Sequence, residues 1–374
     1  MRVAMDLTAL NANPSGIDRY LNGMVHSLAQ LEKRAEFFLF INFEDRSRFA
    51  APNESLKNFC VLPICLRPRF VRLFFQQILQ PLLLYLLRID VLHSPTFIMP
   101  LWRARARHVL TIHDMSSFVL PRSHPPIRRG PLYERIVRAS IRRADLVTVP
   151  SGSVKQDILH FVSDVNAHRI RVIPCGVNQT FYPRDAAEVR TVLQRYRIPT
   201  PYILFVGMLD PRKNLATLIE GFAALVKTGR PEHLVLAGPS GWSPNEWSRD
   251  DVRDRIHFPG YIAEEDLPFV YSGAALFVYP SWLEGFGFPP LEAMASGIPV
   301  IASDTSSLRE NLAGAATLIS PNECKQLSAA MLMLLSDESA RATAIAAGLE
   351  RSRAFRWDRF AAATFAAYES LAGC

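Results

Sequence analysis

The amino-acid sequence predicts an α/β protein with two domains, each built on a parallel β-sheet. First, a length of 374 residues exceeds what one hydrophobic core usually serves, so two domains are expected. Second, short apolar segments alternate with helix-length segments in both halves, a pattern typical of β-α-β units. Third, 49% hydrophobic and 21% charged residues is ordinary for a folded α/β chain.

The strands are expected at apolar runs bounded by turn residues or charges. They are RVAMDL (2–7), EFFLFIN (36–42), DVLHSP (90–95), HVLTIHD (108–114) and DLVTVPS (145–151), then PYILFVG (201–207), HLVLAG (233–238), IHFPGY (256–261), ALFVYPS (275–281) and PVIAS (299–303). Because each half repeats the same scheme, we expect two Rossmann-like domains.

The join between the domains is expected near residue 178. Pro174, Gly176 and Pro183 interrupt the periodicity before a new helix at about 184–197. The predicted domains are therefore 1–178 and 179–355. Residues 356–374 form an amphipathic helix that needs a partner surface, and we expect it to pack back on the first domain.

Charge is unevenly distributed along the chain. Residues 1–180 hold 24 Lys and Arg against 13 Asp and Glu, a net +11, whereas the remainder has 18 against 22, a net −4. A basic first domain suits an anionic partner such as phosphate-bearing lipid, a bilayer surface or nucleic acid. Plain solvation of the surface explains the excess equally well.

We expect a cytoplasmic protein, because the sequence offers no clear export signal. Its 5 cysteines are scattered without metal-site spacing and are interpreted as reduced thiols. Asp6 interrupts the N-terminal apolar run, which is a poor signal peptide and a good first strand. The apolar stretch 70–89 contains Arg, Gln and Pro, so a spanning helix is not expected. A helix packed under the strand 90–95 is preferred, and a membrane-docking helix remains the alternative.

Residues 280–303, PSWLEGFGFPPLEAMASGIPVIAS, carry the most informative pattern. Glu284 lies in a glycine-containing loop, and Glu292 lies in the first turns of a helix that begins near two prolines. Free N–H groups at such a helix start, beside exposed loop amides, suit hydroxyls and anions, and a carboxylate there can accept hydrogen bonds from a sugar diol. For Glu292 alone, a favourable interaction with the helix dipole is the simpler interpretation.

The pattern E-x7-E followed by A-x-A-S-G-x-P-V-I-A-S resembles the signature of family 4 retaining glycosyltransferases. The other landmarks follow in the order of that family, so the resemblance implies the GT-B fold, two Rossmann-like domains that face each other across a cleft. It also implies that Glu292 binds the ribose and that Glu284 orients sugar hydroxyls.

Two motifs in the first half resemble landmarks of the family. PSGIDRY (14–20) resembles its glycine loop, where Gly16 would let backbone amides approach the donor phosphates; a turn that caps the next helix, through Ser15 or Asp18, is the alternative. TIHD (111–114) resembles a strand end whose His113 would face the transferred sugar, at the sheet edge where such folds bind ligands.

Two motifs in the second half resemble the family's donor site. FVGMLDPRKNLATLIEGF (205–222) resembles its phosphate-binding loop, in which Arg212 and Lys213 would neutralise the diphosphate. Many members carry Arg where this chain has Met208, which leaves open whether Arg212 supplies that cation. PGYIAEEDLPFVYSGAALFVYPS (259–281) resembles the region that holds the base through backbone groups, although Tyr261 could equally be a core aromatic.

The resemblance thus implies a set of catalytic and donor-binding residues. The catalytic residues are Glu284, His113, Lys213 and Arg212, and the donor-binding residues are Gly16, Gly207, Tyr261, Ile262, Phe286, Gly287, Phe288, Leu291 and Glu292. The sequence contains no D-x-D, the usual carboxylate pair for a divalent ion on a nucleotide diphosphate, so no metal or other cofactor is expected.

The resemblance is strongest to bacterial mannosyltransferases and rhamnosyltransferases of surface-polysaccharide assembly. The expected reaction transfers a hexose with retention from GDP-mannose or a GDP-6-deoxyhexose, with UDP-sugars as the alternative. The expected partners are the nucleotide sugar, a lipid-linked oligosaccharide and the anionic cytoplasmic face of the inner membrane, and not nucleic acid.

Three other functions are less well supported by the sequence. A GT-B sugar-nucleotide epimerase would need proton-transfer groups at the sugar ring, and no obvious pair is present. A dinucleotide-dependent oxidoreductase would need G-x-G-x-x-G after the first strand, which is missing. A catalytically silent membrane or nucleic-acid adaptor would have no need of both glutamates and the Arg-Lys pair.

Overall fold

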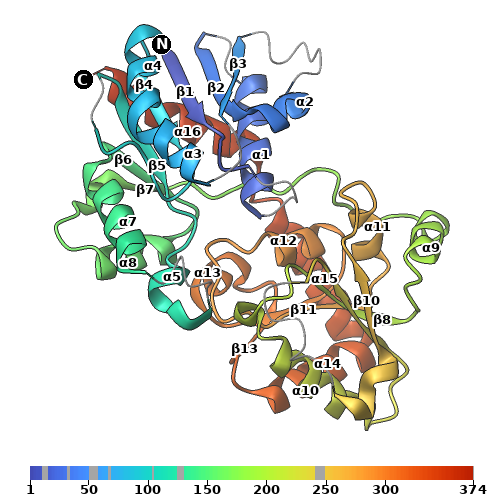
Figure 1. The fold of residues 1–374 in the computed structure, drawn as a ribbon. Coiled ribbons are helices and arrows are strands. Elements are labelled where there is room, and N and C mark those ends of the chain that lie inside the picture. Colours follow the sequence, from blue (N-terminus) through green and yellow to red (C-terminus); the bar gives the residue numbers. More distant parts are fainter. Residues whose placement is uncertain are drawn as a thin grey trace. The chain divides into compact units, whose positions relative to one another are not determined.

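The computed structural model of the protein describes residues 1–10, 16–31, 34–49, 58–65, 69–102, 105–123, 130–240 and 249–373. The chain forms two compact units (Figure 1). The first comprises Met1–Val119, Pro126–Gly176 and Arg356–Cys374, and the second comprises Leu120–Pro125 and Val177–Phe355. The second unit therefore starts close to residue 178, and it also takes in a short segment from the first half, which the sequence did not predict.

The first unit contains a parallel sheet with the strand order β3-β2-β1-β4-β5-β6-β7 among the described residues. Its strands are β1 (Arg2–Asp6), β2 (Glu36–Asn42), β3 (Phe59–Cys65), β4 (Val91–Ser94), β5 (Arg107–Thr111), β6 (Leu146–Val149) and β7 (Ile170–Val172). Its helices are α1 (Gly16–Leu31), α2 (Arg46–Phe49), α3 (Arg69–Phe74), α4 (Gln80–Leu86), α5 (Ser116–Val119), α7 (Pro131–Arg143), α8 (Gly152–Phe161) and α16 (Trp357–Ala372).

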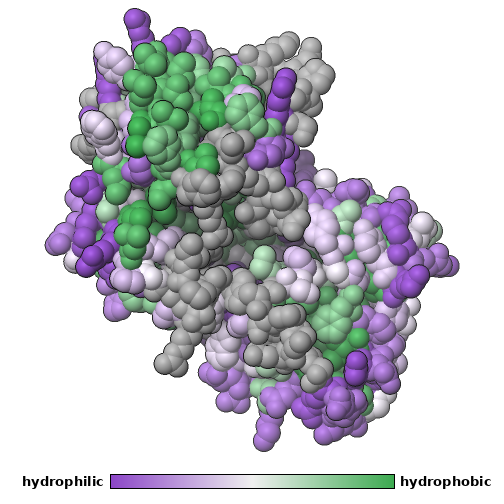
Figure 2. All heavy atoms as spheres, viewed as in Figure 1, coloured by the Kyte–Doolittle hydropathy of each residue, from purple (hydrophilic) through white to green (hydrophobic). Residues whose placement is uncertain are grey.

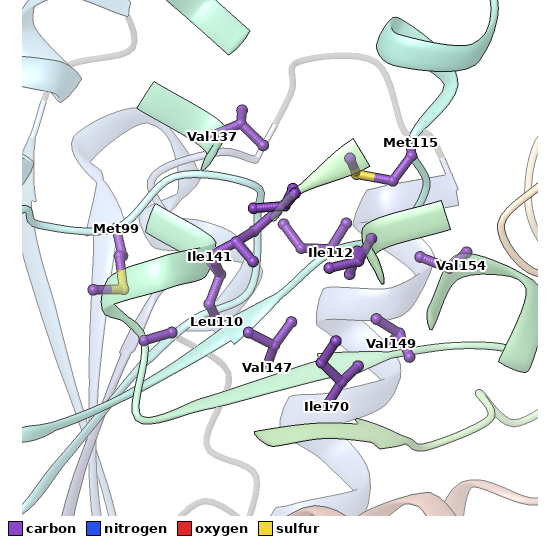
Figure 3. Packing of buried hydrophobic residues seen from close by; sticks show 13 residues of the cluster. Met99, Leu110, Ile112, Met115, Val137, Ile141, Val147, Val149, Val154 and Ile170 are labelled. Carbon is purple, nitrogen blue, oxygen red and sulfur yellow. The ribbon is translucent and has the colours of Figure 1, made fainter. Parts of the chain in front are cut away.

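Buried aliphatic side chains join the sheet of the first unit to its helices. Leu110 of β5 and Val147 of β6 pack with Ile141 of α7 and Val154 of α8 in one cluster (Figure 3). This packing is expected where a parallel sheet is covered by helices, because its strands then lack a solvent-exposed face.

The last helix, α16, belongs to the first unit and packs along α1. Its Tyr368 hydroxyl lies 2.7 Å from Nδ1 of His93 on β4, and the His93 Nε2 lies 2.7 Å from the hydroxyl of Thr111 on β5. Trp357 at the start of α16 packs against Gly23 of α1, where an added Cβ would come within 2.2 Å of the indole. The C-terminal helix is therefore tied to the first sheet by hydrogen bonds as well as by apolar contact.

The second unit contains a parallel sheet with the order β10-β9-β8-β11-β12-β13 among the described residues. Its strands are β8 (Tyr202–Val206), β9 (His233–Ala237), β10 (Ile256–Gly260), β11 (Leu276–Tyr279), β12 (Val300–Ser303) and β13 (Thr317–Ile319). Its helices are α9 (Ala186–Arg195), α10 (Leu215–Val226), α11 (Leu267–Ser272), α12 (Phe288–Ala295), α13 (Ser306–Leu312), α14 (Cys324–Ser336) and α15 (Glu338–Ser352). The predicted α/β fold with two Rossmann-like sheets is confirmed.

The apolar stretch 70–89 is helical as far as Leu86, with a π-helical turn, Phe75–Leu79, between α3 and α4. One face packs under the sheet as predicted, with Phe75 and Leu84 buried in a cluster that includes Leu92 of β4. The opposite face is exposed. Among the described helices, none combines the length and the apolarity needed to cross a bilayer.

Candidate active site

The loop after β8 presents two cations next to the end of the second sheet. Asp210 begins a short 3-10 turn, Pro211–Lys213, and its carboxylate accepts a hydrogen bond of 2.9 Å from the backbone N–H of Arg212. Asn214 follows in the left-handed region and donates from its side chain to the carbonyls of Pro280 and Pro321, at 3.1 and 2.7 Å. The loop is therefore held from both ends, which fixes the position of Lys213.

Lys213, Tyr279 and Glu284 form a compact polar cluster. The Lys213 Nζ donates to Glu284 Oε1 at 2.6 Å and to the Tyr279 hydroxyl at 2.7 Å. The lysine and glutamate side chains are only 10% and 14% exposed, so the ion pair is mostly shielded from water. Burial is the largest single influence and acts to lower the pKa of Lys213, but Glu284, Tyr279 and Asp210 together more than offset it and the pKa is raised. Lys213 is therefore a fixed positive charge at neutral pH.

Arg212 is the second cation of the loop, and it pairs with the acid that caps the same turn. Its guanidinium lies 3.1 Å from Asp210 Oδ2, and the arginine side chain is 19% exposed while the aspartate is fully buried. Because this pair forms within one turn, Arg212 is held at the surface of the loop beside Lys213. Met208, at the position where arginine is common in the family, is 40% exposed.

The loop that carries Glu284 is fastened to the start of α13. The Glu284 N–H donates to the Ser306 hydroxyl at 3.0 Å, and the Ser307 hydroxyl donates to the Glu284 carbonyl at 2.8 Å. The loop ends at Gly287, which precedes α12 with φ +87°, and a Cβ there would lie 2.6 Å from Leu308. Only glycine fits this position without strain, and it sets the direction in which α12 begins.

Glu292 lies in α12, as predicted, and is buried against α11. Its Oε2 accepts a hydrogen bond of 3.0 Å from the hydroxyl of Tyr271, and the glutamate is 3% exposed. The carboxylate therefore has a protein partner in this structure. Its assignment to a sugar diol remains a prediction, and Tyr271 is the residue that would hold its orientation.

Glycines end three neighbouring strands of the second sheet. Gly207 follows β8, Gly238 follows β9 and Gly260 ends β10. Gly238 has φ +143°, its N–H donates to the Gly260 carbonyl at 2.8 Å, and an added Cβ would lie 2.0 Å from the carbonyl oxygen of Gly207. Backbone rather than side chains thus forms this sheet edge, which is where parallel α/β sheets bind ligands. The sequence interpretation included Gly207 but missed Gly238.

The remaining predicted donor residues of the second unit differ in exposure. Tyr261 is 47% exposed, so its interpretation as a core aromatic is wrong. Ile262, Phe286 and Leu291 have buried side chains, and Phe288 is half-buried. Buried side chains leave mainly backbone groups for a ligand, as expected for Ile262.

The two predicted residues of the first unit lie at the ends of its elements. Gly16 is exposed at the start of α1, and an added Cβ would meet no atom within 4 Å. Pro14 and Ser15 of the same motif lie outside the described residues. His113 follows β5 and donates from Nε2 to the Pro95 carbonyl at 2.7 Å, while burial lowers its pKa. A neutral imidazole held in this way keeps Nδ1 as an acceptor.

The structure thus brings Lys213 and Glu284 into contact, and it adds residues that the sequence interpretation missed. In the sequence, Tyr279 reads only as a strand residue and Asn214 only as part of the loop motif, and no pattern pairs Tyr271 with Glu292. Among the residues that the structure describes, no group of three or more His, Cys, Asp or Glu side chains could hold a metal ion. The cluster supplies a positive charge and a paired carboxylate beside the glycine backbone at the end of β8. This combination suits an anionic, hydroxyl-bearing ligand.

The fold defines the class of protein. The structure matches sucrose-phosphate synthase from Thermosynechococcus elongatus with a TM-score of 0.77 over 99% of this chain and 98% of that chain, at 23% sequence identity. Two Rossmann-like domains in this arrangement along the chain define a GT-B protein.

The sequence comparisons define the family. Residues 14–181 match Glycosyltransferase Family 4, and residues 194–351 match Glycosyl transferases group 1. The chain is 35% identical over 287 residues to O-antigen chain mannosyltransferase B of Escherichia coli, covering 75% of this chain and 74% of that protein. It is 29% identical to the serotype-specific mannosyltransferase WbdA of Escherichia coli over 59% of this chain, but over only 28% of that longer protein. The chain belongs to the family 4 glycosyltransferases, as its sequence motifs indicated, and is a glycosyltransferase.

Proposed function

We propose that this glycosyltransferase moves a hexose, mannose or a 6-deoxyhexose such as rhamnose, from a GDP-sugar to a lipid-linked saccharide in O-antigen assembly, with retention of the anomeric configuration. The similarity to O-antigen chain mannosyltransferase B supports mannose and the O-antigen context. We further propose that the enzyme acts at the cytoplasmic face of the inner membrane, where the basic first half of the chain would meet anionic lipid.

One observation carries the proposal for the reaction: Lys213 is charged, nearly buried and held by Glu284 and Tyr279. A fixed cation stabilises negative charge best where water is excluded and where the charge does not have to reorganise during reaction. The leaving nucleoside diphosphate of a sugar donor gains negative charge as its bond to the sugar breaks. Lys213 would stabilise that charge, with Arg212 beside it as a second cation.

The proposed chemical step balances without a cofactor. The bond from the sugar C1 to the β-phosphate oxygen breaks, and the bond from C1 to the acceptor oxygen forms on the same face of the ring. The acceptor proton passes to the departing phosphate oxygen. Glu284 would orient sugar hydroxyls and need not act as a nucleophile, whereas Glu292 would hold the ribose diol.

The proposal is tested by donor binding and hydrolysis with the purified full-length protein. GDP-mannose, GDP-rhamnose, UDP-glucose and UDP-N-acetylglucosamine are compared by calorimetry and product analysis, with and without a chelator. Selective binding of a GDP-sugar that survives the chelator supports the proposal. Selective binding of a UDP-sugar would replace the donor assignment, and metal-dependent turnover would contradict the absence of a cofactor.

A further inference from the structure

The helical segment formed by α3, the π-helical turn and α4 has two unlike faces. On the inner face, Phe75 packs edge-on against Phe40 with ring centroids 5.9 Å apart, and Gln76 donates to the buried Asp6 carboxylate at 2.7 Å. Phe75 and Leu84 belong to the buried cluster under the first sheet. The segment is therefore anchored to the fold by one face, and the other face is free to have a separate role.

The outer face carries large apolar side chains that a solvated helix would not present. Seven are at least 40% exposed, and hydrophobic residues gather over α3 and α4 in Figure 2. They are Leu73, Phe74, Ile78, Leu79, Leu82, Tyr85 and Leu86. The spacing of Phe74, Ile78, Leu82 and Leu86 places four of them along one stripe. A contiguous exposed apolar stripe of this kind marks an interaction surface.

An exposed tryptophan is fixed next to this stripe. The Gln77 side chain donates to the Met99 carbonyl at 3.1 Å and accepts from the Leu101 N–H at 2.9 Å, which holds the 99–101 segment on the helix. Trp102 follows directly and is 74% exposed. The indole combines an apolar body with one N–H donor, which suits the boundary between lipid headgroups and acyl chains.

The segment of the sequence that carries the stripe is rich in basic residues. Residues 55–113 contain one acid, Asp90, against eight basic residues: Lys57, Arg67, Arg69, Arg72, Arg88, Arg103, Arg105 and Arg107. The Asp90 carboxylate accepts the backbone N–H of Arg2 at 2.8 Å. Arg88 and Arg105 are exposed. An exposed apolar stripe in a basic segment that presents Arg88 and Arg105 to solvent is complementary to anionic headgroups over a hydrocarbon layer, whereas a stripe that pairs with a second protein copy gains nothing from this excess charge.

We propose that the stripe formed by Leu73, Phe74, Ile78, Leu79, Leu82, Tyr85 and Leu86, with Trp102 beside it, is an interfacial docking surface that inserts into an anionic bilayer. The segment is anchored through its inner face, so it would lie along the interface and would not cross the bilayer. This inference deepens the proposed function, since it names the surface that would bring the enzyme to a lipid-linked acceptor. It is tested without donor or acceptor, so either proposal can fail alone.

The test is sedimentation of the full-length protein with vesicles of phosphatidylethanolamine and phosphatidylglycerol, and with vesicles of phosphatidylcholine. The triple variant Ile78→Ser, Leu82→Ser, Leu86→Ser alters exposed side chains and leaves the inner face intact. Removing three leucine-sized contacts should weaken partitioning by at least roughly 100-fold. Met333→Ser, at a 45% exposed position on α14, is the matched control and should bind as the wild type does.

Two further measurements separate the alternatives. The tryptophan emission of the protein, to which 5 tryptophans contribute, should shift to shorter wavelength on addition of anionic vesicles, and Trp102→Phe should lose that shift while the protein still sediments. Binding of wild type and triple variant to an equal extent would overturn the proposal, as would no binding to anionic vesicles. A wild-type dimer that the triple variant converts to a monomer, without vesicle binding, would assign the stripe to a second copy of the chain and also overturn it. Unchanged donor binding by the triple variant would show that the reaction site is intact.

Discussion

Replacing Lys213 by methionine should separate the catalytic charge from the stability of the fold. Methionine keeps most of the side-chain volume and removes the ammonium that lies 2.6 Å from Glu284. Glu284 is 14% exposed, so its carboxylate would lose its cation in a mostly dry environment. Breaking such a pair by removing one partner costs about 3 kcal/mol of unfolding free energy.

The effect on turnover follows from the role proposed for the charge. Loss of one preorganised group that stabilises charge in the transition state lowers kcat by roughly 100- to 1000-fold. The double variant Lys213→Met, Glu284→Gln removes both charges and should recover most of the lost stability. It should not recover turnover, because the cation at the diphosphate is still missing.

The assay combines urea unfolding of the wild type, both single variants and the double variant with steady-state sugar transfer. A double-mutant cycle then gives the coupling between the two side chains. Wild-type turnover in a folded Lys213→Met variant would refute the role of this cation. Additive losses of stability in the double variant would show that the ion pair is not coupled as its geometry implies.

Three other predictions concern stability. Gly238→Ala should cost about 2–4 kcal/mol, because its φ is +143° and its Cβ would lie 2.0 Å from the Gly207 carbonyl oxygen; urea unfolding checks this, and a change below measurement error would contradict it. Gly23→Ala should cost about 1–3 kcal/mol, because the added Cβ would lie 2.2 Å from the Trp357 indole, and a shift in thermal midpoint reports the loss. Burial, with a smaller effect of His113, lowers the pKa of His93 to about 3. The imidazole binds a proton near pH 6.5 in the unfolded chain but not in the folded one. The contribution of His93 to the free energy of unfolding should therefore be fully present above that pH and fall by about 1.4 kcal/mol per pH unit as the pH drops towards 3. His93→Gln should flatten this dependence, and an unchanged slope would be inconsistent with a neutral buried imidazole.

The sequence predicts the inner strands of both sheets but not three of the four edge strands. The strands that it did not predict are β3, β7 and β13, and each lies at an edge. Pro63 in β3 weakens a strand pattern because it lacks an N–H, and β7 has two exposed residues among its three. Edge strands lack the continuous apolar run that burial on both faces imposes on central strands, so their signal in the sequence is weak.

The sequence predicts individual motif residues of the candidate site but not the contacts between them. Lys213 and Glu284 were identified separately, but their contact joins positions 71 residues apart and depends on how two loops follow the sheet. In the sequence, Tyr279 cannot be distinguished from any other buried strand residue. Only the structure shows that its hydroxyl accepts a hydrogen bond from Lys213. Gly238 had a detectable signal, since it ends a predicted strand as Gly207 does. The exposed stripe on α3 and α4 could not be told from a buried helix by composition alone.

Transfer of mannose from GDP-mannose to lipid-linked saccharide extracted from membranes, followed by NMR of the new anomeric centre, tests the proposed reaction as a whole. We expect a mannosylated product with the configuration of the donor, and its loss in the Lys213→Met variant. An inverted product, or transfer that proceeds from UDP-sugars and not from GDP-mannose or GDP-rhamnose, would contradict it.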